Sequence, residues 1–386
     1  MRDLFLLRPD VVFLNHGAFG ACPRPVFEAY QRWQVELERQ PVEFLSRRSA
    51  DLIAWARGRL GQYIGADPAD LVYVTNATTG LNVVARSLPL EPDDEVVSTD
   101  HEYGAIERTW RFVCETRHAR YVKAAVPVPL ASAEAVVEAV WARVSPRTRI
   151  LHLSHLTSPT ALIFPVAELC RRARSAGILT VVDGAHAPGQ IPVNLDQVGA
   201  DFYSANCHKW MCAPKGAAFL YARRAAQPLL SPLVVSWGWR PDVPGPSPFI
   251  DEQQRQGTRD IAAWLAVPAA IDFMHEHRWP EHQGACHALA TAARRAITAV
   301  TRLPALSPES PDWFGQMVSV PVPWSDAAVA QRRLREEFGI EIPVFSWNGL
   351  ALLRISVQAY NSAADVDRLV DAVRRMIPPA AAPSSS

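Results

Sequence analysis

The order of hydrophobic and polar positions predicts an alternation of strands and helices over the first two-thirds of the chain. Short apolar runs predict strands at 70–74, 94–99, 149–154, 178–183, 201–206 and 217–222. Between them, apolar residues three or four positions apart predict helices at 26–38, 79–88, 105–117 and 164–177. Buried runs that alternate with helices favour an α/β fold, with a mostly parallel sheet between two layers of helices.

The pattern changes near residue 260. It then predicts helices at 261–276, 287–300 and 364–377 and strands at 317–322, 340–345 and 350–357. We interpret residues 260–377 as a smaller α+β domain that follows a large domain at 26–259. Residues 1–25 are expected to form an N-terminal arm that contributes to the active site and the small domain. The proline-rich stretch 237–249 is expected to be an extended loop, and the tail 378–386 to be disordered.

Composition narrows the functional classes. The 386 residues contain 39 basic and 39 acidic side chains, so bulk charge gives no reason to expect nucleic acid or a membrane as partner. No apolar run is long enough to span a bilayer, and no signal peptide is expected at the N-terminus. The six cysteines are scattered without metal-ligand or disulfide spacing, which favours a reduced, cytoplasmic setting and no metal site.

Lysine is rare in this chain, with only Lys123, Lys209 and Lys215. Because a guanidinium is never deprotonated in a protein, only these three basic side chains are candidates for imine chemistry. Lys209 follows a predicted strand, where partial desolvation lowers the pKa of its amine as imine formation requires. Lys215 is expected to be a solvated turn residue, and Lys123 to face solvent from a strand. Lys209 is therefore the predicted reactive lysine.

Four polar clusters, at 75–80, 100–105, 183–190 and 206–210, each follow a predicted strand. In an open α/β sheet, ligands bind beyond the carboxyl ends of the strands, so these clusters are expected to meet at one site.

The first cluster has threonine hydroxyls and backbone N–H groups at a helix N-terminus, which is typical of phosphate binding, with a plain helix cap as the alternative. Asp183 ends a buried strand, where a carboxylate is costly unless it meets a cation. A protonated pyridine nitrogen is such a cation, and a turn cap with Gly184 is the alternative. Together with Lys209, these features favour pyridoxal 5′-phosphate (PLP) as the cofactor.

Characteristic segments of the chain are 13–26 (FLNHGAFGACPRPV), 75–82 (TNATTGLN), 100–105 (DHEYGA), 154–162 (SHLTSPTAL), 181–190 (VVDGAHAPGQ), 207–216 (CHKW…PKG), 256–260 (QGTRD) and 352–361 (LLRISVQAYN). With these segments, the chain resembles the fold-type I, class V aminotransferase-like PLP enzymes over nearly its whole length. Within them it is similar to the isopenicillin N epimerase-like branch, which is related to cysteine desulfurases and selenocysteine lyases. The resemblance implies a seven-stranded, mostly parallel sheet in the large domain.

The resemblance also implies roles around the cofactor. Lys209 would form the internal aldimine and move the α-proton, Asp183 would pair with the pyridine nitrogen, and His186 would lie near the phenolic oxygen. His155 stands where many relatives have asparagine beside the ring oxygen. The phosphate would be held by Thr78, Thr79 and His208, and by Thr258 of a neighbouring subunit, which implies a homodimer with a shared active site.

For the substrate, the resemblance implies that Arg354 binds the α-carboxylate by a bidentate pair. Asn15 and His16 would line the mouth of the site. Either His101 or Tyr103 would stack on the cofactor ring, and the sequence does not decide between them.

The type of reaction stays open. A cysteine desulfurase needs a nucleophilic cysteine shortly before the carboxylate-binding arginine, and residues 301–353 contain none, so a persulfide-forming activity is not expected. Epimerisation of an amino acid moiety, by way of a quinonoid, needs a second acid/base, for which Tyr103, His101 and His16 are candidates. A C–S β-lyase on an S-substituted cysteine needs only Lys209. The sequence is also compatible with a decarboxylating deaminase, an aminotransferase and a non-catalytic PLP-binding scaffold.

Overall fold

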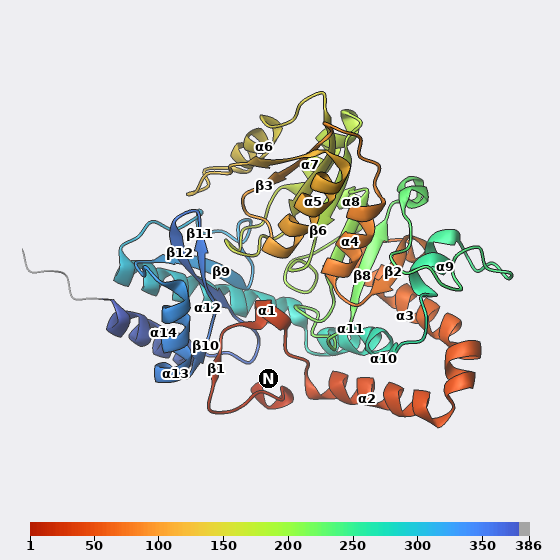
Figure 1. Ribbon diagram of the computed structural model, residues 1–386. Coiled ribbons are helices and arrows are strands. Elements are labelled where there is room, and N and C mark those ends of the chain that lie inside the picture. Colours follow the sequence, from red (N-terminus) through yellow and green to blue (C-terminus); the bar gives the residue numbers. More distant parts are fainter. Residues whose placement is uncertain (378–386) are drawn as a thin grey trace, which may run out of the picture.

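The computed structural model describes residues 1–377, and a seven-stranded sheet lies at its centre (Figure 1). The strands follow the order β2-β8-β7-β6-β5-β3-β4. Their bounds are β2 (Leu71–Val74), β3 (Glu95–Thr99), β4 (Arg120–Ala124), β5 (Thr148–Ser154), β6 (Leu179–Asp183), β7 (Phe202–Asn206) and β8 (Ala218–Ala222). Only β8 runs against its neighbours β2 and β7, so the sheet is mostly parallel, as predicted.

Two layers of helices cover this sheet because its strands are apolar on both faces. Successive residues of one strand enter different cores, as Val181 packs with α4 and α5 while Val182 packs with α6 and α7. The helices of this part are α2 (Arg24–Arg39), α3 (Ser49–Ile64), α4 (Ala77–Ser87), α5 (Gly104–Arg117), α6 (Ala133–Trp141), α7 (Val166–Ser175), α8 (Leu195–Val198), α9 (Pro248–Gln254), α10 (Ala262–Leu265) and α11 (Val267–Glu276). Shorter helical turns lie at Arg2–Leu4, Glu43–Arg48, Pro68–Asp70 and Arg224–Leu229.

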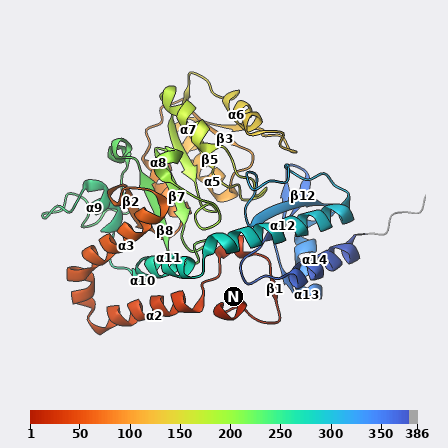
Figure 2. The same ribbon diagram turned by 180° about the vertical axis from the view of Figure 1, so that it is seen from behind.

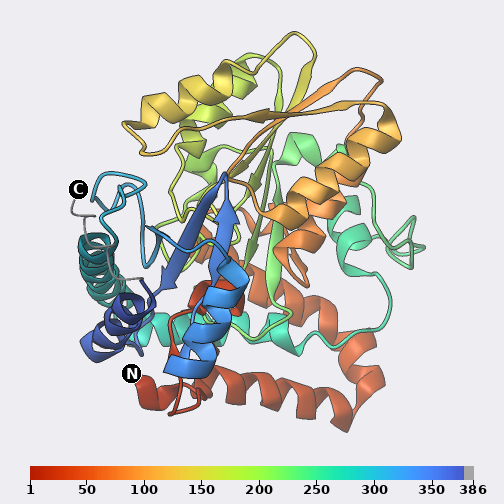
Figure 3. The same ribbon diagram turned by 60° about the vertical axis from the view of Figure 1, so that its left-hand side comes forward.

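The C-terminal part has its own antiparallel sheet, in the order β11-β12-β9, with its own apolar core (Figures 2 and 3). Its elements are α12 (Trp279–Thr301), β9 (Met317–Val322), α13 (Ala327–Phe338), β10 (Ile340–Glu341), β11 (Val344–Trp347), β12 (Leu350–Ser356) and α14 (Ala363–Met376). This sheet and core take up the chain at α12, whereas α10 and α11, which directly follow residue 260, pack in the core of the large sheet.

The N-terminal segment joins the two parts. Strand β1 (Val12–Phe13) pairs in parallel with β10 of the C-terminal part, and helix α1 (His16–Phe19) follows directly. The chain then enters α2, which lies below α10 and α11 in Figure 1 and packs against both. The same short segment therefore contacts the C-terminal sheet and reaches the edge of the large sheet.

Every strand and helix predicted in the first 260 residues is present, with ends that shift by a few residues. The expected single strand at 340–345 is wrong, because Pro343 has no N–H for a ladder and the segment divides into β10 and β11. The stretch 237–249 lacks regular structure up to Pro248, where α9 begins, so most of the predicted loop is confirmed. The predicted disorder at 378–386 lies outside the described residues.

Within residues 1–377, no helix combines the length and apolar character that a membrane span requires. The same residues contain no group of three or more histidine, cysteine or acidic side chains arranged to hold a metal ion.

Candidate active site

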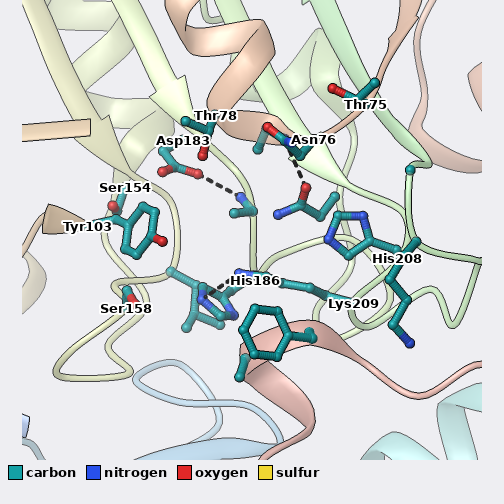
Figure 4. A pocket seen from close by; sticks show the side chains of 18 residues that line it. Thr75, Asn76, Thr78, Tyr103, Ser154, Ser158, Asp183, His186, His208 and Lys209 are labelled. Carbon is teal, nitrogen blue, oxygen red and sulfur yellow. Dashed lines mark hydrogen bonds between the residues drawn. The ribbon is translucent and has the colours of Figure 1, made fainter. Parts of the chain in front are cut away.

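A cavity of about 400 Å³ lies at the carboxyl ends of β2, β5, β6 and β7. All four predicted polar clusters contribute residues to its wall, because the parallel strands end at one edge of the sheet. Figure 4 shows their side chains around the cavity, with Thr78 and Asp183 on one side and Lys209 and His186 facing them. The lining residues are Ala18, Phe19, Thr75, Asn76, Ala77, Thr78, Tyr103, Ser154, Leu156, Ser158, Asp183, Ala185, His186, Asn206, His208, Lys209, Lys215 and Gly216.

Lys209 is half-buried, and its Nζ lies 3.3 Å from His186 Nε2. Burial, together with the charge of Arg354, lowers the pKa of Lys209 to about 7, although Asp183 acts in the opposite direction. The amine is therefore available in its neutral form near pH 7, as a nucleophile or a proton acceptor requires.

Asp183 ends β6 and is 4% exposed. Its Oδ1 accepts the N–H of Ala185 at 2.9 Å, and burial raises the pKa of the carboxyl. Among residues 1–377, Asp183 forms no ion pair with a cationic side chain. A buried carboxylate is costly unless a cation lies beside it, and no cationic side chain pairs with Asp183 here. The site therefore suits a ligand that brings its own positive charge, such as a pyridinium nitrogen.

The start of α4 forms another wall. Asn76 caps the helix by accepting the N–H of Thr79 at 2.8 Å, and Asn206 Oδ1 accepts the N–H of Ala77 at 2.8 Å. Thr78 lies between these two and lines the cavity together with His208. A helix N-terminus with a threonine and a histidine at its mouth has the chemistry of a phosphate site.

Tyr103 and His101 lie differently, although only two positions separate them. Tyr103 precedes α5, lines the cavity and is 44% exposed. His101 is buried outside the cavity wall, with Nδ1 2.7 Å from Thr160 Oγ1 and Nε2 2.9 Å from the Val126 carbonyl. Of the two candidates for the ring-stacking position, the cavity therefore contains Tyr103.

Arg354 does not line the cavity itself but contacts Ser158, which does. It is buried, and its Nη1 donates to the carbonyl and the hydroxyl of Ser158, at 2.8 and 3.1 Å. Its guanidinium lies 4.9 Å from the centre of the Phe345 ring, and its Nε has no partner within residues 1–377. Burial lowers the pKa of Arg354 to about 10, so the side chain is charged near neutral pH.

His16 and Asn15 lie beneath the site and not in its wall. The two ring nitrogens of His16 lie 3.0 Å from the Tyr360 hydroxyl and 3.0 Å from the Lys209 carbonyl. Asn15 Nδ2 donates to Glu341 at 3.3 Å. His16 thus ties the backbone of Lys209 to the C-terminal part of the molecule.

Three other predicted residues do not line the cavity. His155 Nδ1 lies 2.9 Å from the Tyr203 hydroxyl, and the Thr79 hydroxyl donates to Asn76 at 3.1 Å. Thr258 is exposed in the segment between α9 and α10.

Several lining residues were not predicted. Ser154, Ser158 and Phe19 come from the end of β5, the loop after it and α1. They fall within the characteristic segments 154–162 and 13–26, but no role was predicted for these three side chains. Asn76 and Asn206 belong to polar clusters that the sequence did single out, and the helix-cap position of Asn76 was the available signal. Lys215 was expected to be solvated, yet it lines the cavity and donates to the Gly20 carbonyl at 3.1 Å.

None of the six cysteines lines the cavity. Cys22 and Cys286 are typical of the set, because burial raises the pKa of each thiol to about 12. Such thiols are poor nucleophiles near neutral pH.

This fold, with a low-pKa lysine facing a buried aspartate and a helix N-terminus, is the arrangement of a PLP-binding enzyme. Residues 12–369 match the family described as aminotransferase class-V, and the chain belongs to that family, whose members use PLP.

Curated relatives carry two kinds of names. The chain is 38% identical to isopenicillin N epimerase of Streptomyces clavuligerus, over 96% of each chain, and 36% identical to isopenicillin N epimerase of Amycolatopsis lactamdurans, over 97% of each. It is 28% identical to an L-cysteine desulfhydrase of Arabidopsis thaliana, over 95% of this chain and 88% of the other. Among solved structures, a C-DES variant with glycine covalently linked to its PLP cofactor superposes with a TM-score of 0.84 at 20% identity, over 97% and 99% of the two chains.

Proposed function

We propose that the protein is a PLP-dependent epimerase that inverts the α-carbon of an amino acid, or of an amino acid moiety in a larger substrate. The observation that carries this proposal is that Lys209 and Tyr103 line one cavity from different elements (Figure 4). Inversion requires one group to remove the α-proton and a second group to return a proton to the other face. No atom is otherwise gained or lost, and no oxidant is needed.

Lys209 is proposed as the covalent attachment point of the cofactor and as one proton carrier. Its pKa of about 7 lets the amine accept and return a proton near neutral pH. His16 fixes the backbone of Lys209 through the contact to its carbonyl, which orients the lysine toward the cavity.

Tyr103 is proposed as the second proton carrier. Its hydroxyl has no hydrogen-bond partner within residues 1–377, whereas both ring nitrogens of His101 and of His16 already have partners. Tyr103 also lies near enough to Arg354 to act on the charge of that arginine.

The remaining residues are proposed to bind and orient. Asp183 would hold the pyridine nitrogen, and Thr78 and His208 the phosphate, with His186 beside the phenolic oxygen. When bound, PLP supplies an electron sink for the charge left on the α-carbon. Arg354 would bind the substrate carboxylate, for which its charged guanidinium and unpartnered Nε are suited.

We also propose a homodimer in which Thr258 of one subunit reaches the phosphate site of its partner. Its exposed position between α9 and α10, outside the cavity of its own subunit, is compatible with that role. The boundaries at 25/26 and 259/260 stay predictions.

A C–S β-lyase is the second candidate, because curated relatives include an L-cysteine desulfhydrase. Such a reaction needs Lys209 but not Tyr103 as a proton carrier. The lack of a cysteine in the cavity wall argues against a persulfide-forming version of that chemistry.

The test follows solvent deuterium into the α-position. The purified protein is loaded with PLP, its visible absorption band is recorded, and it is incubated in D2O with isopenicillin N and with a panel of L-amino acids. NMR reports α-exchange, and chiral chromatography reports configuration. We expect exchange with inversion in the wild type, and neither the band nor exchange in Lys209→Ala.

Tyr103→Phe separates the two proton carriers. It should retain α-exchange in the starting isomer and lose at least about tenfold in inversion, because general acid–base groups contribute about 10²–10⁴-fold. Exchange and inversion that fall together would contradict the role of Tyr103. Thiol and keto-acid products from S-substituted cysteines, without inversion of any substrate, would replace the epimerase by the lyase.

A further inference from the structure

His186 lies between Trp210 and Lys209 and has polar contacts to both. The indole nitrogen of Trp210 lies 3.2 Å from His186 Nδ1, and the amine of Lys209 lies 3.3 Å from His186 Nε2. His186 and Trp210 are both buried, at 3% and 0% exposure. The three side chains form a short line that ends in the cavity at Lys209.

The chemistry of the indole decides which nitrogen of His186 carries the proton. An indole N–H only donates, so Nδ1 of His186 must accept and cannot carry a proton. Burial, reinforced by the charges of Lys209 and Arg354, places the pKa of His186 well below its ordinary value, so the ring is neutral. The single proton of a neutral imidazole is then on Nε2, the nitrogen that faces Lys209.

An N–H on Nε2 needs an acceptor, and a charged ammonium has none. Lys209 can accept this hydrogen bond only as a neutral amine, through its lone pair. We infer that Trp210 is a positioning residue that fixes the tautomer of His186 and thereby holds Lys209 as the free amine. The inference rests on the proposed function only in that Lys209 is the lysine that binds PLP.

Trp210 is itself held in place. It packs in a cluster with Leu156, Ala161 and Met317, and its ring lies 5.0 Å from that of His16. A Cβ at Gly189 would lie 2.4 Å from the Trp210 backbone, so the chain passes close against the tryptophan on that side. This packing fixes the orientation of the indole ring, so its N–H points toward His186.

Other charged groups also affect the pKa of Lys209, so a test of Trp210 must leave them unchanged. The positive charge of Arg354 acts with burial to favour the free amine, whereas the negative charge of Asp183 favours the ammonium. His208 is beside Lys209 and neutral, because burial lowers its pKa to about 4. Trp210→Phe leaves all three of these groups in the chain, and Trp279→Phe controls for the loss of ring volume that accompanies the loss of the N–H.

The test compares Trp210→Phe with Trp279→Phe. Trp279 is a matched control, since it is also buried and donates its indole N–H at 3.1 Å, but to the Gly189 carbonyl. Without the Trp210 donor, His186 is free to move its proton to Nδ1 and to accept from a charged Lys209 through Nε2. The pKa of Lys209 should then rise.

The first readout is the rate at which the apoprotein takes up PLP, followed by its visible absorption as a function of pH. Because the wild-type pKa is about 7, a rise of one pKa unit lowers the fraction of free amine at pH 7 about fivefold. We therefore expect Trp210→Phe to take up PLP about fivefold more slowly at pH 7 and at the wild-type rate at higher pH. Trp279→Phe should keep the wild-type dependence of the uptake rate on pH. If Trp210→Phe shows that same dependence, the inference is overturned.

The second readout needs no variant of Trp210. Nitrogen-15 NMR of histidine-labelled apoprotein distinguishes the two tautomers, and His186→Gln assigns the signal. A proton on Nε2 in the wild type is expected, and a proton on Nδ1 would refute the inference even if Trp210→Phe does not fold. A wild-type protein that takes up no PLP, yet shows the Nε2 proton, would instead count against the proposed function.

Discussion

Glu102 is a buried carboxyl that the proposed reaction does not use. Its two oxygens accept the hydroxyls of Thr99 and Ser154, each at 2.6 Å, and Ser154 lines the cavity. His152 lies 3.6 Å away and has its Nδ1 toward the Val181 carbonyl, so its Nε2 faces Glu102 without a proton of its own. His152 Nε2 and an ionised Glu102 would both be acceptors and would repel each other. A proton on Glu102 removes this repulsion, so the contact favours the protonated carboxyl.

This arrangement predicts a pH-dependent stability. Burial, with a contribution from the charge of Asp183, raises the pKa of Glu102 from 4.5 to about 7. Between these values Glu102 holds a proton in the folded protein that it has released in the unfolded chain, so its contribution to the free energy of unfolding falls as pH rises, by up to about 1.4 kcal/mol per pH unit. Above about pH 7 this contribution is lost and the dependence flattens.

The measurement is urea unfolding between pH 4.5 and pH 8 for the wild type and Glu102→Gln. The amide keeps the shape without the titration, so the stability of the variant relative to the wild type should rise as pH increases from 4.5 to about 7. Glu115→Gln, at an exposed position on α5, should follow the wild type. Identical slopes in all three proteins would mean that Glu102 does not hold a proton in the folded state.

At the scale of elements, the position of α4 depends on a glycine that contacts β7. A Cβ at Gly80 would lie 2.2 Å from the Ser204 hydroxyl and 3.0 Å from Ser204 Cβ. That hydroxyl donates to the Phe219 carbonyl at 2.8 Å, so it has little freedom to move. The close approach of α4 to β7 places Thr78 at the cavity.

We expect Gly80→Ala to push α4 away from the sheet. Overpacking of this kind costs about 1–3 kcal/mol, and the displaced helix start should also weaken PLP binding. Gly58 in α3 is the matched control, because a Cβ there meets nothing within 4 Å. Gly58→Ala should be neutral or stabilising by up to about 1 kcal/mol. The measurements are the urea midpoint of unfolding and the PLP affinity of both variants. Equal values for Gly80→Ala and Gly58→Ala would refute the steric argument.

The elements show what local sequence can and cannot predict. The strands that lead to the site were predictable, because continuous apolar runs and the polar clusters after them are local signals. Strand β4 has a weaker signal and was expected only around Lys123, since its short sequence RYVKA contains two charged residues and lies at the sheet edge. The pairing of β2 with β8 is also invisible locally, because it joins residues about 150 positions apart along the chain.

The same limit applies to the site. Lys209, Asp183, His186, His208 and Thr78 follow strand ends, and the structure brings them to one cavity. Phe19 and Ser158 reach that cavity only because the N-terminal segment and a loop fold over the sheet edge. The contact of Trp210 with His186 is likewise a product of packing between segments and carries no sequence pattern.

At the scale of the whole molecule, the surface near α9 fits the proposed dimer. Three apolar side chains in the loop before α9, Val235, Trp237 and Val243, are 67%, 82% and 77% exposed. Apolar residues gathered on one exposed loop are typical of a surface that another molecule covers. Thr258 lies just beyond α9, in the segment that leads to α10.

A shared site predicts complementation between two defective subunits. Lys209→Ala and Thr258→Ala should each lower PLP binding and α-exchange. In a mixed dimer, one site would combine the intact Lys209 of one subunit with the intact Thr258 of the other, so co-expression should restore exchange. Lys209→Ala with Asp183→Ala is the control, since both residues belong to one subunit's site and no mixed dimer has a complete one. Failure to complement, or a monomer in sedimentation, would refute the shared site.

Strand β8 also sets the order of events during synthesis. In the described part of the chain, β2 pairs with β8 alone, and β8 in turn joins it to β7, the strand before Lys209. Until residues 218–222 have left the ribosome, the strand that carries the start of α4 has no partner and cannot stand beside the lysine. A nascent chain therefore holds the start of α4 and Asp183 well before β8 is made, whereas Lys209 precedes β8 by only a few residues.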